Sequence, residues 1–435
     1  MSTSISKNDK VQQQYRKMTQ LEHVYELPDS YVGSVDRHEI EAYVFDNDRI
    51  IKKNIEYVPG LYKIYDEIIV NALDQYVRLY NTKVKYKVTK IKICIDPEKN
   101  EISVSNNGQG IDVVMLKEYK CYAPELIFGQ LLTSSNYDKN EKKITGGKNG
   151  FGAKLANIFS TKFLIETVDH VRKLKYYQEY TDNMKNKSDP LITKFSGEPY
   201  TKITFYPDLK RFGLSKLTDE IVSLMRKRAY DVVAWTKPSV KVWYNNEKIE
   251  YSKFENYVNM YIGSERTRVH KVFSPNWEII ATFNTNEVFQ QVSFVNGINT
   301  IRGGKHVEYL SNQICKQMAE LISKKHKMNI KPVYVKNQLF LFVKATIVNP
   351  SFDGQTKETL TTPYSKFGST CLIDSKFINE LMKTSIVDRI VQQAEYKNNK
   401  AFKKTDGKKL QSLKGIPKLS DANKAGGRLA HKCTL

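Results

Sequence analysis

Three short stretches carry the side chains and glycines that a phosphate-binding site requires. Glu67 and Asn71 are four residues apart, so both lie on one face if this segment is helical. Asn106-Asn107-Gly108-Gln109-Gly110 forms the second stretch, and the third runs from Gly146 to Lys154 with four glycines in seven positions. A carboxylate can take a proton from water, an amide oxygen can ligate Mg²⁺, and successive backbone N–H groups can hold phosphates. Together the three stretches predict an ATP site.

Each stretch has an ordinary alternative when taken alone: a solvated helix face, an Asn-Gly turn and a flexible glycine loop. The third lacks the GxxxxGK[ST] order of a P-loop, but it leads into 153–159, a predicted helix whose N-terminus would add to a phosphate site. Ser134, Ser135 and Asn136, just upstream, either contact ribose and phosphates or form a turn.

The elements around these stretches alternate between strands and helices. Apolar periodicity predicts a helix over 63–78, and apolar–polar alternation predicts paired strands over 89–95 and 101–105. Strands over 201–206 and 239–244 flank a helix over 217–236. Hairpins interspersed with helices favour an α+β sandwich over a doubly wound parallel sheet.

A second region begins near residue 251. Strands are predicted over 277–283, 288–295 and 339–348, with a helix over 307–324 between the last two. This order indicates a βαβ crossover domain, closed by a helix over 376–395. From residue 397 onward the chain is basic and contains glycines, as expected of a linker.

The composition narrows the class of protein. The chain has 435 residues, enough for two or three domains, and its formal charge of +22 comes from 69 Lys and Arg against 47 Asp and Glu. The charge fits either a polyanionic partner such as nucleic acid or a Lys-rich solvated surface. Five scattered cysteines without a CxxC pair, no apolar run of the ~18 residues that span a bilayer and no signal-peptide core predict an intracellular protein.

The order of the three stretches resembles that of the Bergerat, or GHKL, ATPases, which include type II topoisomerases, MutL-type repair proteins, ATP-driven chaperones and histidine kinases. Longer strings are similar to eukaryotic-type (type IIA) DNA topoisomerase II, from about Tyr15 to near the C-terminus. These strings are 19–23, 31–35, 58–64, 131–138, 303–307, 355–358 and 416–423.

The resemblance implies a GHKL ATPase α/β sandwich followed by a βαβ-crossover transducer domain. We expect an N-terminal arm at 1–20, the ATPase domain at 21–250, the transducer at 251–400 and a basic linker at 401–435. The linker would lead to a Toprim domain, which is missing here along with the DNA-cleavage core. The chain would then be the N-terminal gate of a topoisomerase that hydrolyses ATP, captures a DNA duplex and changes DNA topology.

The resemblance also assigns roles to residues. Glu67 matches the general base, Asn71 the Mg²⁺ ligand and Asn106 a polar residue beside adenine. Gln355, Thr356 and Lys357 match the transducer loop that reaches the γ-phosphate, with Lys357 as a catalytic cation. The remaining matches to ATP-binding residues are Ser134, Ser135, Asn136, Gly147, Lys148, Asn149, Gly150, Phe151, Gly152, Ala153 and Lys154.

Partners follow from the same resemblance. Tyr15 matches an arm residue that crosses to the nucleotide of the other protomer, which implies a homodimer formed by arm exchange on ATP binding. Lys324, Lys325 and Lys327 match a basic loop that touches double-stranded DNA; a solvated helix end is the alternative. We expect a nuclear location if the protein is cellular. The Lys-, Asn- and Tyr-rich composition suits an AT-rich protist and a large DNA virus equally, and for a virus we expect a host-cell viral compartment or the virion.

One departure and two alternatives remain. Gly354 stands where relatives commonly have Ser, which is expected to loosen the loop before Gln355 without removing its sensors. A chaperone or mismatch-repair ATPase of the same fold is one alternative. A DNA-binding clamp that holds nucleotide without hydrolysing it is the other.

Overall fold

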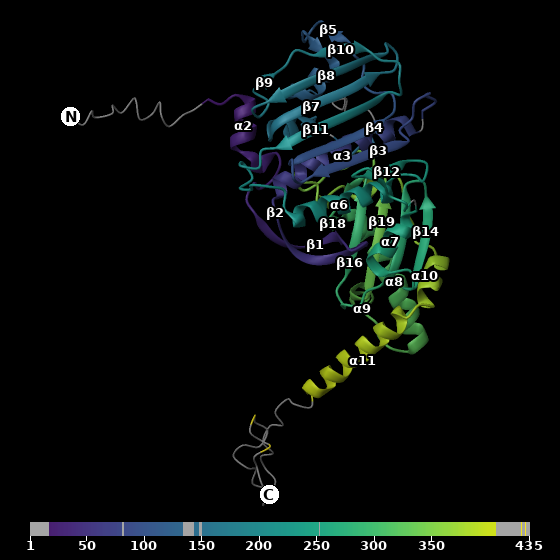
Figure 1. Cartoon of the computed structure of the whole chain (residues 1–435). Helices are drawn as coiled ribbons and strands as arrows, with labels where there is room; N and C mark the ends of the chain where they lie inside the picture. The colour runs from purple at the N-terminus through teal and green to yellow at the C-terminus, as the bar shows by residue number, and fades with distance from the viewer. Residues whose placement is uncertain are drawn as a thin grey trace, which may run out of the picture.

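Two β-sheets, each packed against helices, form the body of the molecule, one above the other in Figure 1. The computed structural model describes residues 17–80, 82–133, 143–147, 150–251, 253–405, 428 and 431, without the side chains of 398–405. No helix in these ranges combines the length and apolar character that crossing a membrane requires.

The upper sheet has nine strands in the order β10-β8-β7-β11-β4-β3-β12-β13, with β9 paired to β8 outside this path. Its pairs are antiparallel except β12, which runs parallel to β3. The mixed sheet confirms an α+β arrangement. Its strands are β3 Lys90–Asp96, β4 Glu101–Asn107, β7 Ser160–Asp169, β8 Leu174–Thr181, β9 Asn186–Lys187, β10 Leu191–Lys194, β11 Tyr200–Pro207, β12 Lys241–Tyr244 and β13 Glu247–Lys248.

Helices cover one face of this sheet. Alternate residues of β3, namely Ile91, Ile93 and Ile95, are buried toward them, whereas Lys92 between them is exposed. Pro59 begins the longest helix of this layer, because its fixed φ suits the first helical turn. The four helices are α3 Pro59–Tyr80, α4 Ala123–Gly129, α5 Gly152–Ile158 and α6 Asp219–Trp235.

Smaller elements surround this layer. A capping box between Thr19 and Glu22 starts α2 (Gln20–Glu26), and the 3₁₀ turn η1 (Pro28–Ser30) follows it. The hairpin of β1 and β2 packs on α6, which the sequence analysis did not anticipate. The strands of this hairpin and of a second, short one are β1 His38–Asp46, β2 Arg49–Tyr57, β5 Met115–Leu116 and β6 Cys121–Tyr122.

The lower sheet has the order β14-β15-β19-β16-β17. β16 and β19 are parallel, and α8 (Lys305–His326) lies between them in the sequence, which confirms the predicted βαβ crossover. The first strand, β14, was not predicted. The remaining elements are α7 Phe254–Ile262, β14 Arg268–Ser274, β15 Trp277–Phe283, β16 Gln290–Val295, β17 Ile298–Asn299, β18 Gly303–Gly304, α9 Pro332–Asn337, β19 Leu339–Ala345, β20 Thr359–Leu360 and η2 Tyr364–Lys366.

One strand of the lower sheet belongs to two hydrophobic cores. Phe340 and Phe342 of β19 join the core under the upper sheet, whereas Leu341 and Val343 pack with residues of α8. Successive side chains of a strand point to opposite faces, so β19 binds both cores at once. The two sheets are therefore joined by packing as well as by the chain.

Buried polar contacts reinforce this junction. Arg228 on α6 donates from Nε to Asp66 Oδ1 on α3 at 2.6 Å and from Nη2 to the carbonyl of Gly297 at 2.8 Å. Asn299 on β17 donates to Asp231 Oδ2 at 2.9 Å. Because Arg228 and Asp231 are fully buried, losing one partner would leave an uncompensated charge, and these contacts fix how the two parts sit.

The closing helix predicted over 376–395 is two helices, α10 (Ser375–Met382) and α11 (Ile386–Thr405). The Thr384 hydroxyl donates to the Leu381 carbonyl at 2.7 Å, a side-chain bond that competes with the helical pattern and ends α10. α11 then projects away from the lower sheet (Figure 1) and extends into the range 401–435 predicted as a linker.

His270 on β14 gives the lower sheet a pH-dependent contact. Its Nε2 lies 3.0 Å from Glu278 Oε1 and its Nδ1 lies 3.3 Å from Glu255 Oε1. The hydrogen bond to Glu278 is the main cause that raises the pKa of His270. A raised folded-state pKa adds stability that is fully present below the unfolded value near 6.5 and is lost as pH rises through the folded value.

We therefore expect His270→Gln to lower the melting temperature more at pH 6 than at pH 9, measured by thermal unfolding monitored by circular dichroism. His38→Gln, at an exposed histidine of β1, is the control. An equal loss at both pH values for His270→Gln would contradict the assignment.

Candidate nucleotide site

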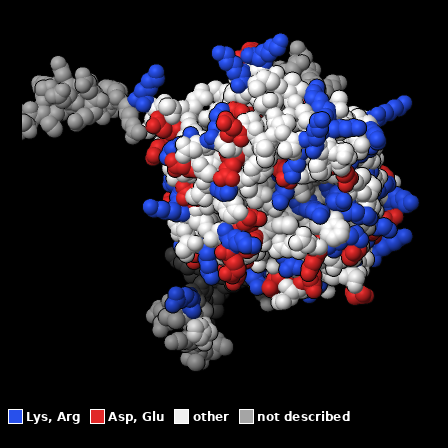
Figure 2. Space-filling view, turned by 45° about the horizontal axis from the view of Figure 1, so that its top comes forward, with Lys and Arg blue, Asp and Glu red and all other residues white. Residues whose placement is uncertain are grey.

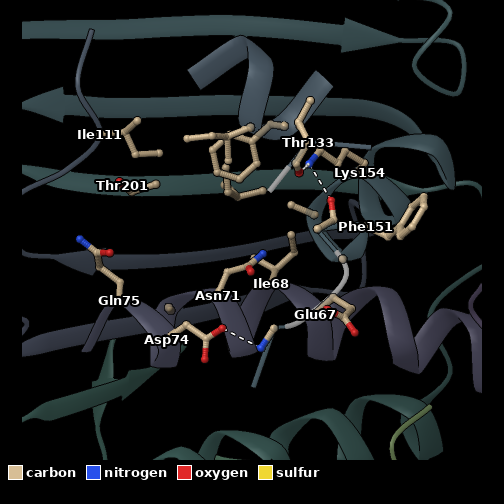
Figure 3. Close-up of a pocket in the computed structure, with 18 of the residues that line it drawn as sticks. Glu67, Ile68, Asn71, Asp74, Gln75, Ile111, Thr133, Phe151, Lys154 and Thr201 are labelled. Carbon is tan, nitrogen blue, oxygen red and sulfur yellow. Dashed lines mark hydrogen bonds between the residues drawn. The ribbon is translucent and has the colours of Figure 1, made fainter. Parts of the chain in front are cut away.

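A cavity of about 660 Å³ lies between the upper sheet and α3. Its size is in the range of small-molecule and cofactor sites. β4 and β11 form its roof, and the face of α3 that carries Glu67 and Asn71 forms its floor (Figure 3). The start of α5 and a loop of the lower domain, the part of the chain that contains the lower sheet, complete its wall. The three sequence stretches therefore meet in one place.

Glu67 is almost fully buried at one end of the cavity. Its Oε1 accepts a hydrogen bond from Lys357 Nζ at 3.0 Å, and the same oxygen is ion-paired with Lys63 Nζ. Burial alone would raise the pKa of this carboxyl, but the charges of Lys357 and then Lys63 outweigh it and hold the pKa at about 2. The side chain is a carboxylate at neutral pH and, while both lysines remain, a weak base.

The other oxygen of Glu67 explains the glycine that begins α5. A Cβ at Gly152 would lie 2.0 Å from Glu67 Oε2, so any side chain would have to displace the acid. Gly152 also lines the cavity. The glycine loop therefore serves close approach to the carboxylate, in addition to any phosphate contact.

Asn71 and Asp74 continue the floor of the cavity along α3. Asn71 is exposed toward the cavity, one turn after Glu67. Asp74 is buried, and its carboxylate accepts the backbone N–H groups of Gly146 at 2.7 Å and Gly147 at 2.8 Å. Figure 3 draws one of these two bonds. Burial raises the pKa of Asp74, and the two N–H bonds oppose that shift. Asp74 thus anchors the entry of the glycine loop to α3.

Lys154 on α5 binds carbonyl oxygens in this structure. Its Nζ donates to the Thr133 and Gly150 carbonyls, both at 2.6 Å (Figure 3). Burial lowers the pKa of this ammonium to about 8. It remains largely charged at neutral pH and is held at the wall of the cavity by neutral partners.

The two asparagines at the end of β4 have different surroundings. Asn106 lines the cavity and donates to the carbonyl of Asn107 at 2.9 Å. Asn107 instead accepts the backbone N–H groups of Thr89 and Lys90 at 2.8 Å, which closes the β3–β4 edge. Thr201 of β11, which pairs with Asn106, also faces the cavity.

The loop at 353–357 brings the lower domain to the site. Gln355 and Lys357 line the cavity. Thr356 does not: it lines a neighbouring cavity beside Pro59 and Tyr62. Lys357 has a positive φ of 60°, and its N–H donates to the Gly354 carbonyl at 3.1 Å, so a tight turn aims the lysine at Glu67. A Cβ at Gly354 would meet only Thr356 Oγ1, at 3.9 Å, so serine would fit.

Several predicted residues are not part of the observed cavity. Tyr15, Ser134, Ser135, Asn136, Lys148 and Asn149 lie outside the described residues. Lys324, Lys325 and Lys327 are exposed at the C-terminal end of α8 and do not line it. Conversely, sequence analysis missed Asp74, Lys63 and Thr201. The spacing 67, 71, 74 places Asp74 on the same helix face and could have identified it.

Comparison with known proteins identifies the family of this chain. Residues 57–211 match the family described as histidine kinase-, DNA gyrase B- and HSP90-like ATPases, and residues 238–409 match the DNA gyrase B family. The crystal structure of the ATPase region of Saccharomyces cerevisiae topoisomerase II is 41% identical, with a TM-score of 0.82, and the match covers 88% of this chain and all of that one. The chain belongs to the DNA topoisomerase II family.

Other relatives agree on the region. The ATPase and transducer domains of DNA topoisomerase II from Balamuthia mandrillaris are 43% identical, with a TM-score of 0.83, over 89% of this chain and 99% of that one. DNA topoisomerase 2 of Drosophila melanogaster and of Pisum sativum are 47% and 46% identical over 98% of this chain. The chain spans 30% and 29% of their lengths, so it corresponds to their ATPase region. A chaperone or a mismatch-repair ATPase is therefore excluded.

The anchor at Asp74 generates a prediction. Asp74→Ala removes two hydrogen bonds that hold the glycine loop, each contributing about 1 kcal/mol. We therefore expect the affinity of the protein for nucleotide to fall by about tenfold or more. The affinity for a non-hydrolysable ATP analogue is measured by calorimetry, with the exposed Asp29→Ala as control. Unchanged affinity in Asp74→Ala would show that the loop forms without this anchor.

Proposed function

We propose that Glu67 is the general base of ATP hydrolysis and that Lys357 senses the γ-phosphate from the second domain. The contact between Lys357 Nζ and Glu67 Oε1, across 290 residues of sequence, is the observation that carries this proposal. It brings a cation from the lower domain to the acid at the end of the ATP cavity. The chain is the ATPase region of a topoisomerase II, and this contact supports the roles proposed for Glu67 and Lys357 in it.

In the proposed step, Glu67 takes a proton from a water molecule whose oxygen forms a bond to the γ-phosphorus. The bond between that phosphorus and the β,γ-bridging oxygen breaks, and ADP and phosphate leave. A carboxylate with a pKa of about 2 is a poor base for this purpose. Since burial raises the pKa of Glu67 and Lys357 lowers it, departure of Lys357 toward the γ-phosphate would strengthen the base. ATP would thereby switch on its own hydrolysis.

The donor set fits a magnesium ion shared with the nucleotide. Asn71 presents a carboxamide to the cavity, and the described residues contain no cluster of three or more His, Cys, Asp or Glu that could hold a metal ion. Mg²⁺ commonly keeps several waters and is held by few protein ligands plus substrate phosphates. We propose that Asn71 holds it. The ion would neutralise phosphate charge, while this chain's own residues supply the base and the sensor.

Beyond the site, we propose that the segment to residue 250 works as the ATPase domain and 251–400 as the transducer of a DNA gate. The names of the relatives, DNA topoisomerase 2, support a duplex DNA partner and a nuclear location. Lys and Arg are spread over the visible face with Asp and Glu among them (Figure 2), so charge alone indicates no DNA path there. The exposed Lys324, Lys325 and Lys327 are the proposed contacts, and a homodimer formed by exchange of the arm containing Tyr15 would close around the duplex.

The role of Glu67 is tested by Glu67→Gln, which keeps the volume and removes the base. We expect ATP turnover to fall by about 100-fold or more, as for loss of a general base, while analogue binding persists. Phosphate release is the readout, and the exposed Glu26→Gln is the control. Turnover within a few-fold of the wild-type chain would remove Glu67 from this role.

The role of Lys357 is tested by Lys357→Ala. We expect phosphate release to fall by about tenfold to 100-fold, because one preorganised cation is lost from the developing charge. ATP-dependent dimerisation, followed by sedimentation, should weaken as well. Lys366→Ala, at an exposed lysine of η2, is the control, and normal rates together with normal dimerisation in Lys357→Ala would refute the sensor.

A further inference from the structure

A second lysine, from the same helix as the acid, is ion-paired with Glu67. Lys63 precedes Glu67 by one helical turn on α3, and its Nζ is ion-paired with the same Oε1 that Lys357 contacts. Its side chain is almost fully buried, at 4% exposure. Within the described residues, the Lys63 ammonium has no hydrogen-bond or ion-pair partner other than Glu67. A buried cation of this kind is stable only beside its carboxylate.

Lys63 does not line the proposed ATP cavity. It lines a separate cavity of about 340 Å³ between the two domains, together with Tyr62, Asp66 and Thr356. The larger cavity, which holds Asn71 and Lys154, includes Glu67 but not Lys63. Any effect of Lys63 on ATP must therefore pass through Glu67.

The two carboxylate oxygens of Glu67 therefore have different neighbours. Oε1 carries both lysines, whereas Oε2 points to the start of α5 at Gly152, which lines the ATP cavity. We propose that Lys63 is a positioning residue that holds Oε1, so that Oε2 is the atom that takes the proton from the attacking water. This inference rests on the proposed role of Glu67 as the base.

Lys63 and Lys357 differ in what they can do when ATP binds. Lys357 comes from a turn of the second domain, whereas Lys63 is on the same helix as Glu67. If Lys357 moves to the γ-phosphate, Lys63 is the cation that keeps the buried carboxylate oriented. Burial lowers the pKa of the Lys63 ammonium, and the charge of Glu67 opposes this, so each group sustains the charge of the other.

The test is Lys63→Met in the full chain, which keeps most of the aliphatic stem and removes the charge. We expect kcat for ATP to fall by about tenfold to 100-fold, as for a misplaced reacting group, with the affinity for a non-hydrolysable ATP analogue changed less than about twofold. Lys63→Arg should retain more turnover than Lys63→Met. In the Glu67→Gln background, adding Lys63→Met should cause no further loss, because the two residues act as a unit.

Lys52→Met is the matched control, because Lys52 lines the same small cavity but pairs with Glu41. Near-normal kcat in Lys63→Met, beside an inactive Glu67→Gln, would overturn the positioning role and leave Glu67 as the base. Near-normal turnover in Glu67→Gln would overturn both. If Lys63→Met does not fold, Lys63→Leu replaces it; leucine likewise cannot donate to Oε1, so a kcat equal to wild type would again refute the inference.

Discussion

The burial of one carboxylate, Glu67, is the constraint on which this ATP site depends. An ionised acid in an apolar interior is unstable unless cations or donors surround it. Here one lysine comes from the same helix and another from the second domain. The charge balance of the site is therefore complete only when both domains are in place. The charge balance at Glu67 therefore depends on the position of the second domain, which supplies Lys357.

The surrounding structure separates what is fixed from what can move. The core packing of Phe340 and Phe342 and the buried contacts of Arg228 hold α3, α6 and the lower sheet together. The turn that carries Lys357 is closed by the bond from its N–H to the Gly354 carbonyl, and residues 353–357 belong to neither hydrophobic core. A nucleotide that competes for Lys357 would therefore act on the loop first. Larger domain movement would require the buried contacts of Arg228 to rearrange.

Local sequence patterns predicted the scaffold well, because periodicity and turn residues act over short distances. α3, the β3–β4 pair and the β16–α8–β19 crossover all follow from such patterns. The break at Thr384 was missed because one side-chain hydrogen bond decided it. Asp74 was missed because its partners come from the glycine loop, far away in the sequence. Lys63 pairs with Glu67 one helical turn on, and this i,i+4 spacing could have identified it. The contact of Lys357 with Glu67 could be anticipated only from family resemblance, since no local pattern links residues 290 positions apart.

The central claim is that Lys357 leaves Glu67 and binds the γ-phosphate when ATP binds. A structure with Mg²⁺ and a non-hydrolysable ATP analogue tests this claim most directly. In this structure, Lys357 Nζ lies 3.0 Å from Glu67 Oε1. With the analogue bound, we expect Nζ within hydrogen-bonding distance of a γ-phosphate oxygen and separated from Glu67, while Lys63 remains on Oε1. A bound structure in which Lys357 stays on Glu67, with no contact to the γ-phosphate, would contradict the account.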